Sequence, residues 1–148
     1  MLNDEEFVKQ WMEKPYPEVP KKFRTDFEKK NVFSDKGLAV RSKTEASITN
    51  KYDAYGIPMK YEEPLYLKGV GWVLPDFKLL NVRLRKELIH EHMGMMDDPQ
   101  YADKNVKKIN NYMRNGYMPG KNLILTFETR NEPFDARLMD LIIESYLL

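Results

Sequence analysis

Residues 87–128 read ELIHEHMGMMDDPQYADKNVKKINNYMRNGYMPGKNLILTFE, and this stretch decides the fold. It opens and closes with runs typical of strands, over 87–93 and 122–128. Between them, the Asp-Pro pair at 98–99 supplies a helix N-cap and a proline at the first helical position, and Gly116 supplies a helix stop. The stretch therefore predicts strand, helix, strand. Because a helical crossover joins parallel strands, we expect a partly parallel, mixed sheet.

The flanking segments extend this order to seven elements. Ser42 begins a capping pattern that opens a helix, and Gly56 closes that helix. Two extended stretches follow, over 59–67 and 72–82, and the last segment, 134–148, is helical. The predicted order is helix, three strands, helix, strand, helix. This is an α/β (α+β) arrangement with a mixed central β-sheet flanked by helices.

Apolar residues at helical spacing predict which side of each helix faces the core. The expected inward positions are Glu45, Ile48, Tyr52 and Tyr55 in the first helix, Ala102, Val106, Ile109 and Met113 in the second, and Leu138, Leu141 and Ile142 in the last.

Residues 1–40 have a different character from the rest of the chain. Prolines at positions 15, 17 and 20 punctuate them, and residues 21–30 are dense in charges of both signs. One short amphipathic helix is predicted near the start. We expect residues 1–40 to form an N-terminal arm or cap, and residues 41–148 to form the main domain.

Composition excludes several classes of protein. The chain has 148 residues with 24 Lys and Arg against 23 Asp and Glu, a formal net charge of +1, and 42% hydrophobic residues, which is the balance of a globular domain. It has no cysteine, so disulfide scaffolds, thiolate zinc sites and cysteine nucleophiles are excluded. No apolar run approaches the roughly 18–20 residues that span a bilayer, and the first residues lack a signal-peptide pattern. We expect a cytoplasmic protein without membrane contact.

Three acidic residues occur where burial is expected. Asp76 follows a proline inside the apolar stretch 72–82, Glu91 alternates with Ile89 and Met93 on one side of a strand, and Glu45 lies on the inward face of the first helix. Burying carboxylates without compensation is costly, so a divalent cation is a natural common partner. Two carboxylates on adjacent strands can bind Mg²⁺ and leave positions for water and phosphate.

Together with their surroundings, these acids resemble the PD-(D/E)XK nuclease superfamily, and in particular its small members from bacteria and their phages. The resemblance covers about residues 38–148. Five strings carry it in order: VRSKTEASI (40–48), YGIPMKYEEPLYL (55–67), LPDFKLL (74–80), HEHMGMMDDPQYADKNVKKINNY (90–112) and GKNLILTFET (120–129). It implies a restriction-endonuclease-like core and a metal-dependent endonuclease that hydrolyses DNA, with Mg²⁺ as cofactor and Mn²⁺ as a substitute.

The resemblance also implies roles for individual residues. Asp76 and Glu91 would bind the metal, with the backbone carbonyl of His92 as a third ligand. Glu45 would be the first-helix glutamate, which reaches the metal directly or through water. The superfamily's lysine normally lies two residues after the second acid, but Met93 occupies that position. Superfamily members with the lysine displaced to the following helix are known, which makes Lys108 the candidate; Lys104, one turn earlier, is the fallback.

A basic segment accompanies the acids. Residues 104–130 hold six Lys or Arg residues against Glu128 alone, a net charge of +5. Such a patch suits a phosphate backbone, which makes DNA the expected partner. The expected nucleic-acid-binding residues are Arg41, Lys43, Lys104, Lys107, Arg114 and Lys121. Cutting both strands of a duplex usually needs two sites, which makes a homodimer a candidate assembly.

Each of these residues also has an ordinary structural interpretation. Glu45 could complete a capping box with Ser42, Asp76 could be a turn residue after proline, and Glu91 could pair with a lysine across an edge strand. His90 and His92 could be ordinary strand histidines, and Asp97 and Asp98 are better explained as helix caps than as metal ligands.

At the level of function, two alternatives to the nuclease stay open. One is a catalytically inactive nuclease-fold protein that binds nucleic acid or a protein partner. The other is a structural or regulatory module of a mobile element.

Overall fold

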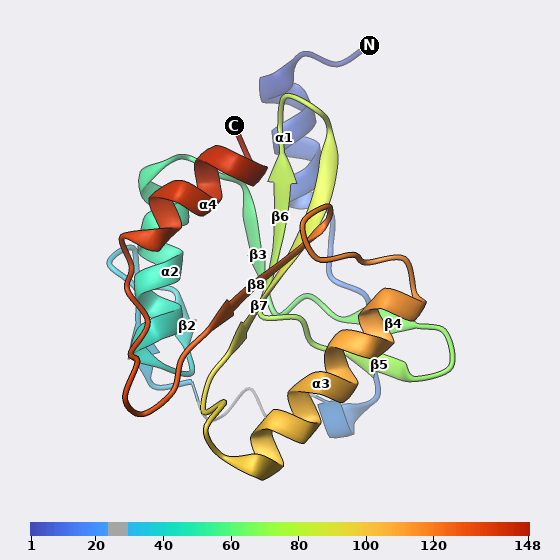
Figure 1. The fold of residues 1–148 in the computed structure, drawn as a ribbon. Coiled ribbons are helices and arrows are strands. Elements are labelled where there is room, and N and C mark those ends of the chain that lie inside the picture. Colours follow the sequence, from blue (N-terminus) through green and yellow to red (C-terminus); the bar gives the residue numbers. More distant parts are fainter. Residues whose placement is uncertain (24–29) are drawn as a thin grey trace.

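A computed structural model describes residues 1–23 and 30–148 (Figure 1). Its central sheet has four strands in the order β3-β6-β7-β8, with bounds β3 Met59–Tyr61, β6 Phe77–Asn81, β7 Lys86–Met93 and β8 Leu123–Phe127. The β3–β6 and β6–β7 pairs are antiparallel, and β8 runs parallel to β7. The predicted mixed sheet is confirmed.

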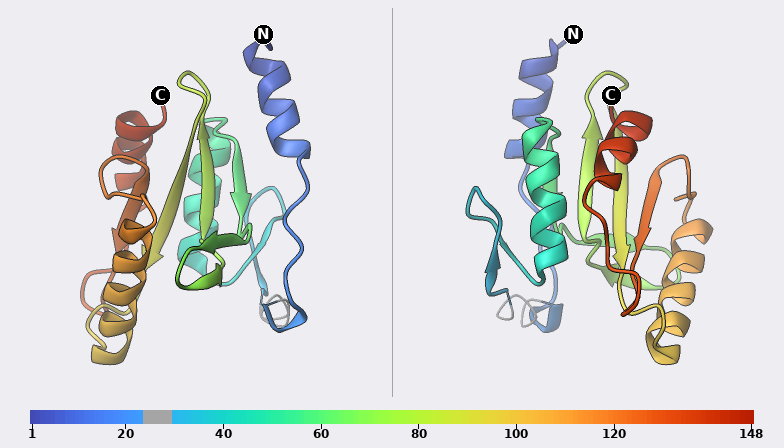
Figure 2. Two further views of the ribbon diagram at one scale, coloured as in Figure 1. Left: turned by 90° about the vertical axis from the view of Figure 1, so that its right-hand side faces the viewer. Right: turned by 60° about the vertical axis from the view of Figure 1, so that its left-hand side comes forward.

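Helices cover both faces of this sheet (Figures 1 and 2). Helices α2 (Lys43–Ala54) and α4 (Leu138–Tyr146) pack on one face, where Tyr52, Phe77 and Ile143 belong to one apolar cluster. Helix α3 (Pro99–Arg114) covers the other face, where Ile89, Tyr112 and Leu123 form a second cluster. Alternation along β7 divides its side chains between these two layers.

The helix boundaries follow the signals in the sequence. Ser42 is the N-cap of α2, and its side chain accepts a hydrogen bond from the Glu45 N–H. Asp98 caps α3 and accepts from the N–H groups of Gln100 and Tyr101. Gly116 follows α3 with φ of +87°, a backbone conformation that glycine adopts without strain. Both predicted helices are confirmed.

The two predicted extended stretches are each interrupted. Within 59–67, β3 ends at Tyr61 and β4 (Leu65–Leu67) starts after a break; within 72–82, β5 (Gly71–Val73) is separate from β6. Glu62 adopts a φ of +50°, which takes the chain out of the sheet. Strands β4 and β5 then pair with each other as a hairpin outside the central sheet. The prediction of two continuous extended stretches was therefore wrong, because each stretch contains parts of two separate strands.

The predicted inward faces are wrong at one or more positions in each of the three helices. In α3, Val106 is 52% exposed and Met113 37% exposed, whereas Asn105 and Tyr112 are buried. Helix α3 turns Tyr112 toward the sheet because its hydroxyl bonds to Glu91 there. The remaining errors are Tyr55, which is exposed at the end of α2, and Leu138 and Leu141, which are exposed in α4 where Met139 and Ile143 are buried instead.

The N-terminal segment contacts both sides of the sheet, with Trp11 beside Glu87 on the α3 side and Val40 in the apolar cluster on the α2 side. It contains α1 (Asp4–Glu13), the short 3-10 helix η1 (Lys21–Phe23) and the strand pair β1 (Val32–Phe33) and β2 (Ala39–Val40). The Trp11 indole N–H donates to Glu87 on β7 at 2.8 Å, and the Lys60 ammonium lies 4.5 Å from the Trp11 ring centre. Most of the charge-dense stretch 21–30 lies outside the described residues. Among the described helices, none is long and apolar enough to cross a membrane.

Candidate active site

Asp76 and Glu91 lie next to each other at one end of the β6–β7 pair, where β6 begins and β7 approaches its end. Phe77 pairs with His90, so Asp76 directly precedes β6 and lies beside the following residues of β7. The Asp76 N–H donates to Glu91 Oε1 at 3.3 Å, and the His92 N–H donates to Asp76 Oδ2 at 2.7 Å. The antiparallel register therefore fixes the two acids next to each other, as the sequence predicted for adjacent strands.

The two oxygens of Glu91 have different surroundings. Its Oε1 accepts a hydrogen bond from the Tyr112 hydroxyl at 2.7 Å, in addition to the one from Asp76. Its Oε2 is buried, and no described residue donates a hydrogen bond to it. The nearest cation is Lys108, whose Nζ lies 3.6 Å away. Unpartnered buried polar atoms are rare in native proteins, so this oxygen requires an explanation.

The electrostatics of the pair favour an added positive charge. Burial raises the pKa of Asp76 well above its ordinary value, and the neighbouring charges of Glu91 and Glu45 raise it further. The His92 N–H and Lys108 act in the opposite direction without reversing the shift. Burial also raises the pKa of Glu91, against the opposing effects of Lys108 and the Tyr112 hydroxyl. Carboxylates perturbed by burial and by each other are typical of functional sites.

Glu45 is buried close to this pair but has partners of its own. Its Oε1 accepts from the Tyr61 hydroxyl at 2.7 Å and from the Arg41 N–H at 3.0 Å. The carboxylate thus bonds to the backbone of Arg41, and the reciprocal half of the capping box with Ser42 is replaced. Because the charge of Glu45 raises the pKa of Asp76, the two acids belong to one electrostatic cluster.

His92 supports the site through its backbone. A strand residue directs its N–H and C=O to the same side of the strand. Since the His92 N–H bonds to Asp76, its carbonyl also faces Asp76, as a third ligand would require. The imidazole lies on the other face of the sheet, 2.8 Å from Thr126 Oγ1 and 2.8 Å from Glu128 Oε1. All four ring nitrogens of His90 and His92 thus have hydrogen-bond partners within the fold.

The donor set fits a cation that keeps part of its water shell. Within residues 1–23 and 30–148, no three His, Asp or Glu side chains form a ready-made metal cage. Mg²⁺ is commonly held by one or two carboxylates, with water and phosphate oxygens completing the shell. Half-buried Asp76 and the Glu91 oxygen that accepts no hydrogen bond from a described residue offer that kind of site.

The predicted basic residues divide into three groups. Lys104 and Lys108 line a cavity of about 240 Å³ with His92 and Tyr101, next to Glu91. Arg41 pairs with Glu62, and Lys121 lines a different cavity, near the start of β8, with Lys86 and Asn122. The side chains of Lys43, Lys107 and Arg114 are exposed, and Arg114 lines a third cavity with Asn110 and Met118.

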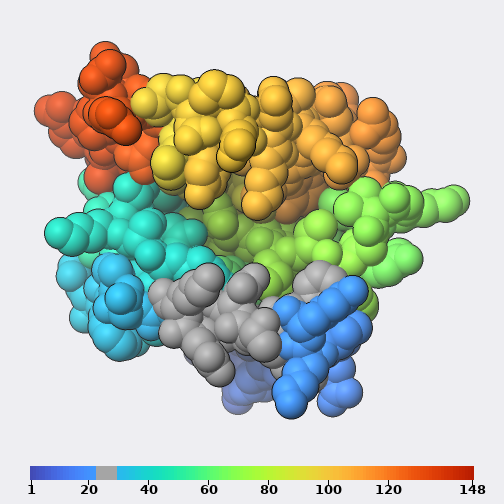
Figure 3. All heavy atoms as spheres, turned by 90° about the horizontal axis from the view of Figure 1, so that it is seen from below, coloured from blue at the N-terminus to red at the C-terminus, as the bar shows by residue number. Residues whose placement is uncertain are grey.

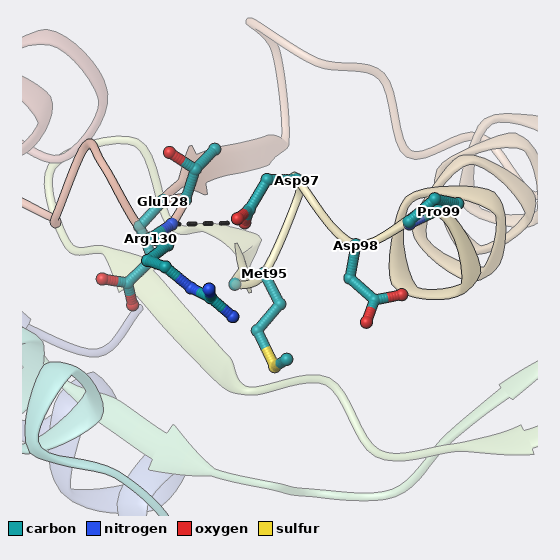
Figure 4. Close-up of a pocket in the computed structure, with 8 residues that line it drawn as sticks. Met95, Asp97, Asp98, Pro99, Glu128 and Arg130 are labelled. Atoms are coloured by element: carbon teal, nitrogen blue, oxygen red, sulfur yellow. Dashed lines mark hydrogen bonds between the residues drawn. The ribbon is translucent and has the colours of Figure 1, made fainter.

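The loop between β7 and α3 borders another cavity, of about 550 Å³ (Figure 4). Asp97 and Asp98 lie on it, but both have structural partners. Asp97 Oδ1 accepts from the Arg130 N–H at 3.2 Å, and Asp98 caps α3. Their interpretation as structural acids is confirmed for Asp98, the helix cap.

Two tyrosines complete the site, and the sequence did not assign either a role there. Tyr61 and Tyr112 each donate a 2.7 Å hydrogen bond to a buried carboxylate. For Tyr112 a signal exists, because it lies four residues after Lys108 and therefore on the same side of α3. For Tyr61, at the end of β3, the sequence contains no comparable signal.

Comparison with known proteins adds no relative. No family model, no curated protein and no solved structure matches this chain. The function is therefore argued from the site itself.

Proposed function

We propose that this protein is a Mg²⁺-dependent endonuclease of the PD-(D/E)XK type that hydrolyses phosphodiester bonds in DNA. One observation carries the proposal: the buried Oε2 of Glu91 accepts no hydrogen bond from a described residue, with Asp76 beside the same carboxylate and the Lys108 ammonium at 3.6 Å. A purely structural acid at this depth would have a full set of donors.

The residues of the site have separate roles in this proposal. Asp76 and Glu91 would hold the ion, with the His92 carbonyl on the same side and Glu45 acting through water or charge. Mg²⁺, when bound, supplies positive charge that stabilises the negative charge developing on the attacked phosphate. Lys108 positions the attacking water or donates to a phosphate oxygen. Water adds to phosphorus and the bond to the 3′-oxygen breaks, which leaves a 5′-phosphate and a 3′-hydroxyl.

The order of the elements supports the same assignment. From α2 onward, the central sheet is built in the order helix, three antiparallel strands, helix, parallel strand, helix. This agrees with the restriction-endonuclease-like core that the resemblance implies. Asp76 directly precedes the second strand of the sheet and Glu91 lies on the third, which are the positions of the metal ligands that the resemblance implies.

A cleavage assay tests the proposal. The purified chain is incubated with plasmid DNA in Mg²⁺, in Mn²⁺ or in EDTA, and nicked and linear products are measured. We expect cleavage with either metal and none with EDTA, and loss of cleavage in Asp76→Asn and Glu91→Gln. Asp97→Asn is the matched control, because that acid lies nearby but bonds to the backbone of Arg130. Equal cleavage by Asp76→Asn and the unaltered chain contradicts the metal assignment.

A second candidate is a nuclease fold without catalysis that binds nucleic acid or a protein partner. Two observations favour it: Met93, buried where the superfamily's lysine normally lies, and the absence of a three-donor cage among the described residues. Such a protein binds DNA with a salt-dependent affinity and gains no stability from metal. No cleavage of any DNA form, together with such binding, would favour this candidate over the nuclease.

A further inference from the structure

The hairpin β4–β5 has one anchored face and one exposed face. Leu67 is buried in the cluster beneath α3, and Leu65 and Val73 pack against that cluster. On the other face, Tyr66 and Trp72 are direct cross-strand partners with ring centres 5.5 Å apart in an edge-to-face arrangement. Tyr66 is 60% exposed. The hairpin therefore presents an aromatic pair to solvent on a rigid support.

The hairpin is connected both to the acidic residues of the candidate active site and to the helix that carries Lys108. Strand β5 ends at Val73, only three residues before Asp76. At the turn of the hairpin, the Lys68 N–H donates to the Asn115 side chain at 2.7 Å, and that side chain donates back to the Lys68 carbonyl at 3.2 Å. Asn115 ends α3, the helix that carries Lys108. The aromatic pair is thus held in a fixed relation to the acids and the lysine.

The surface around the hairpin is suited to a strand of nucleic acid. Viewed from below, the molecule is hollowed between α3 and the rest of the chain, and the hairpin projects at one end of this hollow (Figure 3). Lys68 at the turn is an exposed cation of the hairpin, and Arg114, which donates to Asn111, is an exposed cation one residue before Asn115, the residue that bonds to this turn. Aromatic rings beside cations are the arrangement with which proteins hold unpaired bases and their phosphates.

We infer that Tyr66 and Trp72 stack on unpaired nucleobases, so that the substrate is DNA with a single-stranded segment next to the cut. This inference rests on the proposed nuclease function and specifies its substrate. In a duplex, the faces of the bases are covered by their neighbours, and opening one stack costs a few kcal/mol. An aromatic pair on a rigid hairpin therefore favours bases that are already unpaired.

Intrinsic fluorescence tests this directly, because the chain has only two tryptophans. Trp11 is buried and bonded to Glu87, whereas Trp72 is half-buried on the hairpin. In EDTA, titration with a short oligothymidylate is expected to quench the fluorescence, and an equal amount of blunt duplex to quench it far less. Trp72→Phe keeps a ring at that position and is expected to abolish the quenching, since only Trp11 remains.

A second variant separates stacking from a structural role of the pair. Tyr66→Thr retains a residue that favours strands, and a lost stack is expected to weaken oligothymidylate binding about tenfold or more. Tyr55→Thr, which removes an exposed tyrosine at the end of α2, is the matched control and should bind normally. Thermal unfolding of each variant shows whether the hairpin has stayed folded.

The outcomes distinguish this inference from the proposed function. Absence of quenching, equal quenching by blunt duplex, or equal loss of binding in Tyr66→Thr and Tyr55→Thr overturns the inference, even if the chain cuts plasmid DNA with Mg²⁺. Quenching that requires Trp72 supports the stacking surface, even if no metal-dependent cleavage is found and the nuclease proposal fails.

Discussion

The two faces of β7 treat their buried polar side chains differently. On the α2 side, His90 lies 2.7 Å from the Tyr52 hydroxyl and 2.8 Å from Thr126 Oγ1, and His92 lies 2.8 Å from the same Thr126 oxygen. On the α3 side lies Glu91, the residue between these two histidines, and its Oε2 accepts no hydrogen bond from any described residue. Neighbouring residues of one strand thus differ in whether their hydrogen bonds are satisfied.

On the α2 side, one assignment of protons satisfies the whole chain of groups. The Glu128 carboxylate accepts, so His92 Nε2 donates to it and His92 Nδ1 accepts from the Thr126 hydroxyl. Thr126 then accepts from His90 Nε2, and His90 Nδ1 accepts from Tyr52. Burial lowers the pKa of His90 to about 3, which agrees with a neutral ring. The comparison teaches that the polar groups on the α2 side satisfy one another, which favours stability. On the α3 side, Glu91 Oε2 accepts no hydrogen bond from a described residue and can face a cation.

The largest expected effect is that of removing a charge from the acidic side. Asp76→Asn keeps an oxygen that can accept from the His92 N–H but lacks the negative charge. We expect cleavage to fall to the level of the EDTA control, because the variant lacks a charge of the proposed metal site. Gel assays of plasmid cleavage measure this. Cleavage by Asp76→Asn at the rate of the unaltered chain would show that the two faces do not differ in function.

The same variant is expected to be more stable at neutral pH. Folding raises the pKa of Asp76 above its ordinary value of 3.8, so the folded chain binds that proton more tightly than the unfolded chain. Stability is therefore lost as the pH rises above 3.8, and the loss stops once the folded group has also ionised. Asp76→Asn does not titrate. Its advantage in free energy of unfolding should be absent near pH 3.8 and grow toward neutral pH in urea denaturation.

Lys108→Met is expected to have the next largest effect on cleavage. It keeps the length of the side chain and removes the cation 3.6 Å from Glu91 Oε2. Loss of one preorganised donor to a reacting group typically costs roughly 10²–10³-fold in rate. Lys104→Met, one turn earlier on α3, is the matched control. If Lys104→Met loses cleavage and Lys108→Met keeps it, the role belongs to Lys104.

Tyr112→Phe is expected to have a smaller effect, because in the proposed site Tyr112 would position the ligand Glu91 and would not itself contact the ion or substrate. It removes the 2.7 Å hydrogen bond to Glu91 Oε1 and leaves the ring in place. Removing a partner of a metal ligand typically costs roughly 10–100-fold in metal affinity or activity. We expect the Mg²⁺ concentration for half-maximal cleavage to rise. A variant with a lower maximal rate but unchanged metal dependence would contradict this role.

Thr126→Val, on the α2 side, should change cleavage least. The substitution preserves shape but leaves two imidazole nitrogens without their shared partner. Leaving a buried polar group unpaired costs about 1–3 kcal/mol, so the free energy of unfolding should fall by that order. Cleavage per folded molecule should be nearly unchanged. A loss of cleavage as large as that of Asp76→Asn would show that the hydrogen-bonded face also takes part in the reaction.

Local signals in the sequence predicted the frame of this site. Ser42, the Asp98-Pro99 pair and Gly116 define helix ends through contacts within a few residues, which is why the helices could be located. The antiparallel register of β6 and β7 then follows from a short connection, and it brings Asp76 to Glu91.

Contacts between distant residues explain what the sequence did not predict. Helix α3 turns away from its apolar stripe because Tyr112 donates to Glu91 Oε1 and Lys108 forms an ion pair with Glu91 Oε2, on a different element. Arg41 pairs with Glu62, which adopts a φ of +50° where the strand pattern predicted continuation. Polar partners of this kind depend on the assembled fold, and no local period encodes them.

Thermal unfolding with and without divalent metal tests the central claim most directly, since it requires no substrate. The midpoint is measured in EDTA, Mg²⁺ and Mn²⁺ for the unaltered chain, for Asp76→Asn and for the control Asp97→Asn. A cation that binds the folded chain raises the midpoint by mass action. We predict a metal-dependent rise in the unaltered chain and in Asp97→Asn, and none in Asp76→Asn. No rise at millimolar metal, or an equal rise in Asp76→Asn, would contradict a cation site at Asp76 and Glu91.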